Sequence, residues 1–152
     1  MTTQTFADYV ATQDARNTIQ LNVRKWTEML CEALEQNYIE TTIRRQKFFA
    51  ANETGNPEIM AKVTEQRIEE IRNGDHYKFI IETGRKYHKI IMVTESDSRS
   101  VHAFIDKKTG ELYKAASFKA PAKGVRFDLR IIDQREDVLR NCDWAGGYLY
   151  QR

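Results

Sequence analysis

The chain has 152 residues, enough for one domain with a hydrophobic core, and its composition of 41% hydrophobic and 30% charged residues is that of a globular protein. Its longest apolar runs have four residues, whereas a membrane-spanning helix needs about 20, so we expect no membrane partner. The net charge of +2 hides an asymmetry, because residues 1–75 hold nine Lys and Arg against twelve Asp and Glu, and residues 76–152 hold fifteen against ten. The basic second half therefore favours an anionic partner.

The first half of the chain carries helical periodicity. Between Asn17 and Tyr38 the apolar residues recur three or four apart, which predicts one amphipathic helix with the face Ile19, Val23, Trp26, Leu30, Leu34 and Tyr38. We expect a shorter helix over 3–10 and a helical continuation over 39–49, with Ile43 and Phe48 directed inward. A loop over 51–55 ends this region. The chain start has neither the basic nor the apolar region of a secretory signal, so we expect a cytoplasmic protein.

A second helix is predicted from Asn56 to about Arg72. Asn caps free backbone amides, Pro57 is tolerated in the first turn, and Glu58 complements the helix dipole. Gly74 follows as a stop because glycine accepts the left-handed conformation that ends helices. We expect the apolar face of this helix to consist of Ile59, Val63 and Ile71.

After Gly74 the period changes to two, which is typical of strands. We expect strands over 77–82, 87–94, 101–106 and 111–117, a type I turn over 106–111 with Gly110 at positive φ, and a loop over 118–124. A fifth strand is predicted over 125–132, a helical turn over 135–140, and a final strand over 148–150. The fold class is therefore α+β: a single domain in which N-terminal helices (1–74) pack on a C-terminal antiparallel β-meander (75–152) of about five to six strands.

Few residues carry a pattern typical of catalysis or metal binding. Cys31 and Cys142 lie outside any CxxC spacing, and we interpret both as structural. The three histidines, His76, His88 and His102, lack metal-ligand spacing. We therefore expect no catalytic residue, no metal and no cofactor. A phosphodiesterase or a metal-dependent nuclease built on the scattered carboxylates remains the enzymatic alternative.

The most informative stretch is basic and lies between Leu112 and Arg130. It holds five cations against the single carboxylate of Asp128, interleaved with aromatic residues, and residues 120–124 form a loop of small residues beside them. Lysines and arginines that converge on phosphate oxygens beside an aromatic ring are typical of nucleotide or single-strand recognition. The alternative is an edge strand and loop that positive charge protects from aggregation. The candidate ligand-binding residues are His102, Tyr113, Lys114, Ser117, Phe118, Lys119, Lys123 and Arg126.

The core of this stretch, Lys114-Ala-Ala-Ser-Phe-Lys-Ala-Pro-Ala-Lys-Gly-Val-Arg126, together with the ending Asp143-Trp-Ala-Gly-Gly-Tyr-Leu-Tyr150, resembles a widespread, functionally uncharacterised family of small tailed-bacteriophage proteins. The resemblance covers residues 87–150. It implies a viral protein that acts in the cytoplasm of an infected host cell, where small accessory proteins commonly neutralise host defence, inhibit host enzymes or bind nucleic acid.

The functional hypothesis combines the residues with this resemblance. We expect a non-catalytic protein that sequesters a small anionic ligand, namely a nucleotide immune signal, as an anti-defence sponge. The lysines and Arg126 would hold phosphates, Ser117 would donate a hydrogen bond, Tyr113 or Phe118 would stack on a base, and His102 would add a contact. The alternatives are single-stranded nucleic-acid binding through the same strand and inhibition of a host protein through the acidic helical half.

Two aromatic groups leave further alternatives open. Trp144, Tyr148 and Tyr150 would form either core or a stacking platform, and core packing is favoured. The helix that contains Trp26 would be core unless it pairs with another subunit, and a long amphipathic helix on a small protein favours a homo-oligomer.

Overall fold

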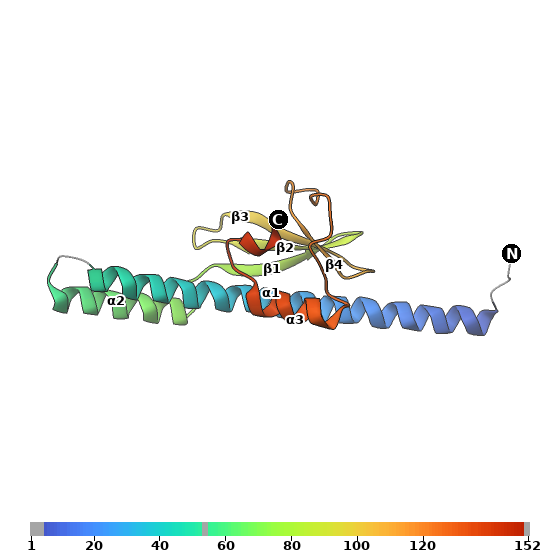
Figure 1. Cartoon of the computed structure of the whole chain (residues 1–152), viewed down its shortest axis with the longest axis horizontal. Coiled ribbons are helices and arrows are strands. Elements are labelled where there is room, and N and C mark those ends of the chain that lie inside the picture. Colours follow the sequence, from blue (N-terminus) through green and yellow to red (C-terminus); the bar gives the residue numbers. More distant parts are fainter. Residues whose placement is uncertain (1–4, 53–54, 151–152) are drawn as a thin grey trace.

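The computed structural model describes residues 5–52 and 55–150. The first helix, α1, runs without a break from Phe6 to Asn52, and α2 (Pro57–Arg72) turns back along its C-terminal end. Figure 1 shows α1 as the long axis of the molecule, with the sheet on one side of its middle. The three predicted helical segments are therefore parts of one helix. The predicted start at residue 3 lies outside the described residues.

The middle of α1 supplies the core face that its periodicity predicted. Val23, Leu30, Leu34 and Tyr38 are buried, and Ile19 and Trp26 are partly buried beside them. Arg135 places its guanidinium 4.3 Å from the centre of the Trp26 ring. The interpretation of this stripe as core is confirmed. The inward prediction for Phe48 is wrong, because α1 has left the sheet at that point and the side chain is exposed.

The prediction for α2 is confirmed at both ends. The Oδ1 of Asn56 accepts hydrogen bonds from the amides of Glu58 (2.9 Å) and Ile59 (3.4 Å), and the helix ends at Arg72. Its predicted apolar face is confirmed at Ile71, which is buried, and is wrong at the other two residues. Ile59 and Val63 are 59% and 54% exposed, and the buried residues are Ile68 and Ile71 in the half of α2 nearest the sheet.

The β half is an antiparallel meander, as predicted, and the structure supplies the strand order β1-β2-β3-β4-β5, which the sequence left open. Its strands are β1 (Lys78–Thr83), β2 (Tyr87–Val93), β3 (Arg99–Asp106), β4 (Glu111–Lys114) and β5 (Phe127–Asp128). Two strands are shorter than predicted. Beyond Lys114 only a bridge between Ala115 and Pro121 continues β4, and β5 ends where the Asp128 carboxylate accepts a hydrogen bond from the amide of Arg130.

The C-terminal segment differs most from the prediction. The helical turn over 135–140 is a full helix, α3 (Ile132–Asn141), and the predicted strand over 148–150 is a 3₁₀ turn, η1 (Gly147–Leu149). The Asp143 carboxylate explains the second difference, because it accepts hydrogen bonds from the amides of Gly147 (3.1 Å) and Tyr148 (3.0 Å) and so caps a helical start.

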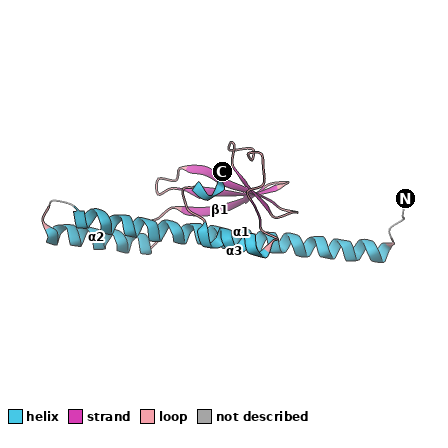
Figure 2. Cartoon of the chain, in the orientation of Figure 1, coloured by secondary structure: helices cyan, strands magenta, loops and turns pink. Residues whose placement is uncertain are grey.

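The sheet packs on α1 through one face, and α1, α2 and α3 lie together on one side of the strands (Figure 2). The core between them holds Phe79, Ile90, Ala103, Ile105 and Leu112 from the sheet. Within the described ranges, no helix is long and apolar enough to cross a bilayer. The opposite face of the sheet, called the outer face below, carries Tyr87, Phe104 and Tyr113, and the ring of Tyr87 packs edge-on against the other two.

Candidate anion-binding cleft

The sheet divides the predicted site residues between its two faces. Along β4, Leu112 points into the core, so Tyr113 points to the outer face and Lys114 points back to the helix side. Phe118 and Lys119 lie beside the outer face, on the loop over 115–126 that rises above the sheet in Figure 1. His102 lies on the helix side with Lys114. The eight residues therefore do not form a single site.

The outer face holds a cleft, called the outer cleft, of about 250 Å³. Four of its lining residues are cations, Arg85, Lys86, Lys89 and Lys119. The one carboxylate among the described lining residues, Glu82, forms an ion pair of 2.6 Å with Arg99. The cleft therefore carries a surplus of positive charge, because its only acid is already neutralised. Its other walls are Thr83, Gly84, Tyr87 and Phe104.

Lys89 stands between two aromatic rings in this cleft. Its Nζ lies 4.5 Å from the ring centre of Phe118 and 5.6 Å from that of Phe104, its cross-strand partner. Lys86 similarly places its Nζ 5.4 Å from the ring of Tyr87. The ring faces orient these ammonium groups without neutralising their charge. Both lysines therefore keep donors for an anion.

The turn between β1 and β2 forms one rim of the outer cleft. The Nζ of Lys107 donates to the carbonyl oxygens of Gly84 (3.0 Å) and Arg85 (3.4 Å), and its amide donates to the carbonyl of Lys86 (3.0 Å). Three oxygens that would repel an anion are therefore already bonded to Lys107.

The loop over 115–126 forms the other rim, and its polar residues hold its shape. The Oγ of Ser117 accepts hydrogen bonds from the amides of Lys119 (3.3 Å) and Ala120 (3.2 Å). Arg126 donates to the carbonyls of Leu149 (2.6 Å), Lys123 (2.9 Å) and Gly124 (2.8 Å). The structure thus gives Arg126 a structural use, which ties the loop to the C-terminal segment, and leaves the side chain of Lys123 exposed.

The two predicted stacking residues differ in access. Phe118 is 50% exposed, so its ring is available to a ligand. Tyr113 packs edge-on against Tyr87 with ring centres 6.2 Å apart, and its hydroxyl donates to the Glu111 carboxylate (3.1 Å). Burial and this hydrogen bond raise the pKa of Tyr113 to about 12, so the phenol stays neutral. Phe118 is therefore the accessible ring of the pair.

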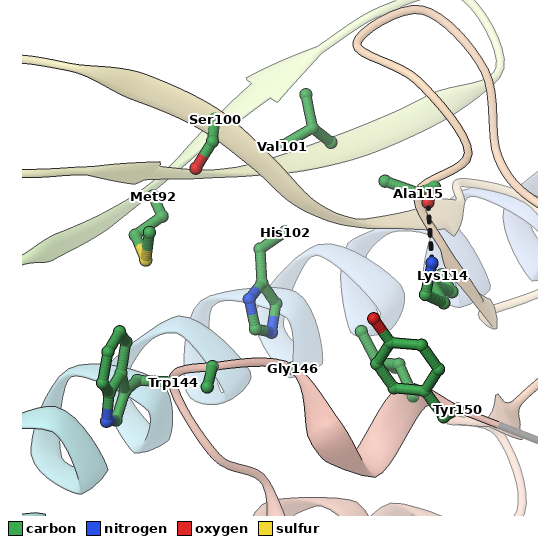
Figure 3. Close-up of a pocket in the computed structure, with 11 residues that line it drawn as sticks. Met92, Ser100, Val101, His102, Lys114, Ala115, Trp144, Gly146 and Tyr150 are labelled. Carbon is green, nitrogen blue, oxygen red and sulfur yellow. Dashed lines mark hydrogen bonds between the residues drawn. The ribbon is translucent and has the colours of Figure 1, made fainter.

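A second hollow of about 320 Å³ lies on the helix side around His102, and we call it the His102 pocket (Figure 3). Its origin is a β-bulge. Ile90 faces Ala103 and the next residue, Ile91, faces Val101, so His102 is an extra residue on β3. The bulge directs the imidazole to the helix side, where its Nε2 lies 2.8 Å from the Tyr148 hydroxyl.

The His102 pocket is a weaker candidate for binding a phosphate. Burial lowers the pKa of His102 to about 4, so the ring is neutral at physiological pH. Lys114 is the only cation among the described lining residues, and its Nζ lies 4.8 Å from the Tyr150 ring centre. Trp144 and Tyr148 pack against the core, which confirms the core interpretation for these two, whereas Tyr150 is exposed.

The cysteines are buried at two places in the core. Burial raises the pKa of Cys31 to about 12 and that of Cys142 to about 11, so both are protonated thiols at neutral pH. In residues 5–52 and 55–150, no three Cys, His, Asp or Glu side chains come together as a metal site would require.

Most residues of the outer cleft were not predicted from the sequence. Arg85, Lys86 and Lys89 come from the first hairpin of the sheet, outside the basic stretch over 112–130. The Arg85-Lys86 pair in a predicted turn was a usable signal. The pairing register of β2 and β3, which places Lys89 opposite Phe104 and next to the loop over 115–126, could not be predicted from the sequence.

The sequence model of a family of unknown function (DUF7717) matches residues 6–151. The chain belongs to this family. The match covers both the helical half and the sheet, so the DUF7717 domain includes the long helix as well as the outer cleft. Neither the curated proteins nor the solved structures contain a match to the chain.

Proposed function

We propose that this protein binds a small phosphorylated ligand, of the nucleotide class, in the outer cleft and retains it without chemical change. The observation that carries the proposal is the convergence of Arg85, Lys86, Lys89 and Lys119 around a cleft whose one acid is paired with Arg99. Four cations with neutralised surroundings match the charge of a diphosphate. The exposed Phe118 ring beside Lys89 would stack on the base.

The arrangement favours binding over catalysis. Of the described residues that line the outer cleft, none is a histidine or a cysteine, and the carboxylate of Glu82 is held by Arg99. General acid–base chemistry needs a group that titrates near neutral pH within reach of the ligand. The finer proposal, that the ligand is a nucleotide immune signal captured by a phage accessory protein, is supported by the sequence resemblance alone.

Calorimetric titration with three probes tests the proposal. The probes are ADP, inorganic pyrophosphate and oligothymidylates of increasing length. We expect ADP to bind more tightly than pyrophosphate, because only ADP offers a base to Phe118. Lys89→Ala combined with Lys119→Ala should weaken ADP binding at least tenfold, which corresponds to about 1.4 kcal/mol. Lys78→Ala, an exposed lysine on β1 outside the cleft, is the matched control.

The same titration distinguishes the nucleic-acid alternative. Binding to a strand should strengthen with oligothymidylate length and fall steeply with salt, because each phosphate contact releases a counterion. A cleft that holds one small ligand should show neither behaviour. Affinity for oligothymidylates that grows with length, together with no ADP binding, would replace the proposal with strand binding.

A further inference from the structure

The N-terminal third of α1 lacks the packing that stabilises the rest of the helix. Residues 6–18 project beyond the sheet and the other helices (Figure 1), and all are exposed except the partly buried Thr12. An isolated helix of this length is marginal in water, and its Thr, Asn, Asp and Val residues are poor helix formers. A partner that covered this segment would bury its apolar side chains and stabilise the helix.

This segment carries an apolar stripe suited to a groove. Phe6, Val10 and Leu21 lie on one helical face, because steps of four and eleven residues return to nearly the same direction. Phe6 is 83% exposed and Leu21 is 71% exposed. Over residues 6–21, two carboxylates, Asp8 and Asp14, stand against one cation, Arg16, which gives a net charge of −1. The segment is thus a mildly acidic amphipathic helix, called the N-terminal segment below.

The opposite end of the molecule offers a matching groove, called the hairpin groove. It lies between α1 and α2, has a volume of about 590 Å³, and contains Ile39 and Ile43. Its cations, Arg44, Lys47 and Arg72, outnumber its one acid, Glu40, among the described lining residues. An apolar floor with a basic rim is complementary to an acidic amphipathic helix.

We propose that the occupant of the hairpin groove is the N-terminal segment of a second copy of this chain, in an antiparallel dimer with its two-fold axis near Met29. Met29 is the midpoint of the helix that begins at Phe6 and ends at Asn52, and it is partly exposed. A two-fold axis there brings both N-terminal segments to both hairpin grooves at once, so the assembly closes with two chains.

The charges along α1 agree with this axis. Asp14 and Arg44 lie equally far from Met29 on either side, so each aspartate would meet the other copy's arginine. Near the axis, Lys25 of one copy would lie close to Glu32 of the other, and both side chains are exposed on the single chain. No other partner is required to satisfy both ends of the helix, because each chain carries the segment and the groove.

Cysteine cross-linking tests the dimer directly. Within one chain, positions 14 and 44 are thirty residues apart on a continuous helix, which is about 45 Å. A disulfide needs Cα atoms within about 7 Å. The double variant Asp14→Cys/Arg44→Cys can therefore form an inter-position disulfide only between two chains. We expect a covalent dimer on mild oxidation of the double variant and of Met29→Cys, and none from Asp14→Cys alone or Arg44→Cys alone.

Sedimentation velocity supplies the independent measurement. We expect twice the chain mass of 17.8 kDa for the native protein. Val10→Glu with Leu21→Glu should return the single-chain mass, and Ala15→Glu, on the other side of the same helix, should leave the dimer intact. A native protein of single-chain mass, a dimer that survives the Val10 and Leu21 substitutions, or a double cysteine variant that does not cross-link would each overturn the proposal. Because the outer cleft lies within one chain, ADP binding is unaffected by that result.

Discussion

Lys86 and Lys89 on the outer face of the sheet keep an exposed charge, whereas His102 and Arg126, elsewhere around the sheet, are neutral or hydrogen-bonded within the fold. On the outer face, Lys86 and Lys89 rest on aromatic rings with their charges exposed to a cleft. On the helix side, His102 is neutral and bonded to Tyr148. On the loop over 115–126, Arg126 is bonded to three carbonyls. A polar side chain whose hydrogen bonds are made within the protein contributes mainly to the stability of the fold. The residues to test for ligand binding are those whose charge the structure orients but does not neutralise.

The largest expected effect is the loss of stability on changing Arg126 to Ala. The substitution removes three hydrogen bonds from a charged donor, each worth roughly 1.5–3 kcal/mol when buried, and partial exposure reduces the total to about 3 kcal/mol. The melting temperature should fall by about 10 °C. Lys123→Ala, a neighbouring exposed lysine, should change the free energy of unfolding by less than about 0.5 kcal/mol. Equal melting temperatures for the Arg126→Ala and Lys123→Ala variants would contradict the structural role assigned to Arg126.

The second largest expected effect concerns Lys89, on the outer face of the sheet. Lys89→Ala should leave the free energy of unfolding nearly unchanged and weaken ADP binding by about tenfold, since a charge-assisted contact to phosphate contributes roughly 1.5 kcal/mol. Its ammonium lies between Phe104 and Phe118, and the carboxylate of Glu82, its cross-strand neighbour on β1, forms its ion pair with Arg99. Circular dichroism melting and calorimetric titration of the same preparation measure the two quantities. A loss of stability without a loss of affinity would make Lys89 a structural residue.

The histidines His88 and His102 should make the stability of the protein depend on pH. Burial holds the pKa of His102 and of His88 at about 4, against an ordinary value of 6.5, and the nearby Arg24 guanidinium adds to the effect at His88. The unfolded chain therefore binds protons below pH 6.5 that the folded chain does not, so the contribution is present above pH 6.5 and is lost as the pH falls toward 4. Each histidine should contribute a slope of up to about 1.4 kcal/mol per pH unit.

Urea unfolding between pH 7.5 and 5 measures this slope. His88→Gln with His102→Gln should flatten it, because glutamine does not titrate and still offers hydrogen bonds to Thr83 and Tyr148. An unchanged slope in the double variant would show that other groups cause the pH dependence.

The smallest expected effect concerns Phe118. Replacing it with alanine removes the ring 4.5 Å from the Lys89 ammonium and the surface on which a base would stack. Stacking of a base on an aromatic side chain contributes about 1 kcal/mol or more, so ADP affinity should fall about fivefold. Pyrophosphate affinity should change less, because pyrophosphate has no base. An equal loss for both probes would assign Phe118 to the shape of the loop.

The elements that the sequence predicted well are those set by local chemistry. The cap at Asn56, the core stripe from Val23 to Tyr38 and the antiparallel hairpins of the meander all follow from residue spacing and turn signals. The pairing of the fifth strand with β4 did not follow from them. The strand predicted over 148–150 failed because the Asp143 carboxylate, several residues upstream, caps a helical turn there. Alternating aromatic residues alone do not reveal such a competitor.

The site was harder to predict because it depends on which face of the sheet each residue occupies. Lys114 and Lys119 are close in the sequence, but β4 directs the first to the helix side and the loop brings the second to the outer cleft. His102 changes face because of one extra residue in β3. A bulge of this kind leaves no mark in the pattern of hydrophobic residues.

Native mass spectrometry tests the central claim most directly. The protein and its Lys89→Ala/Lys119→Ala variant would each be incubated with the same nucleotide-containing bacterial extract, recovered, and analysed before and after mild denaturation. We predict that the native protein carries a phosphorylated small molecule, that this molecule is released intact, and that the variant is empty. A native protein that emerges empty, or a variant that carries the same molecule in the same amount, would contradict the assignment of the outer cleft as a ligand site.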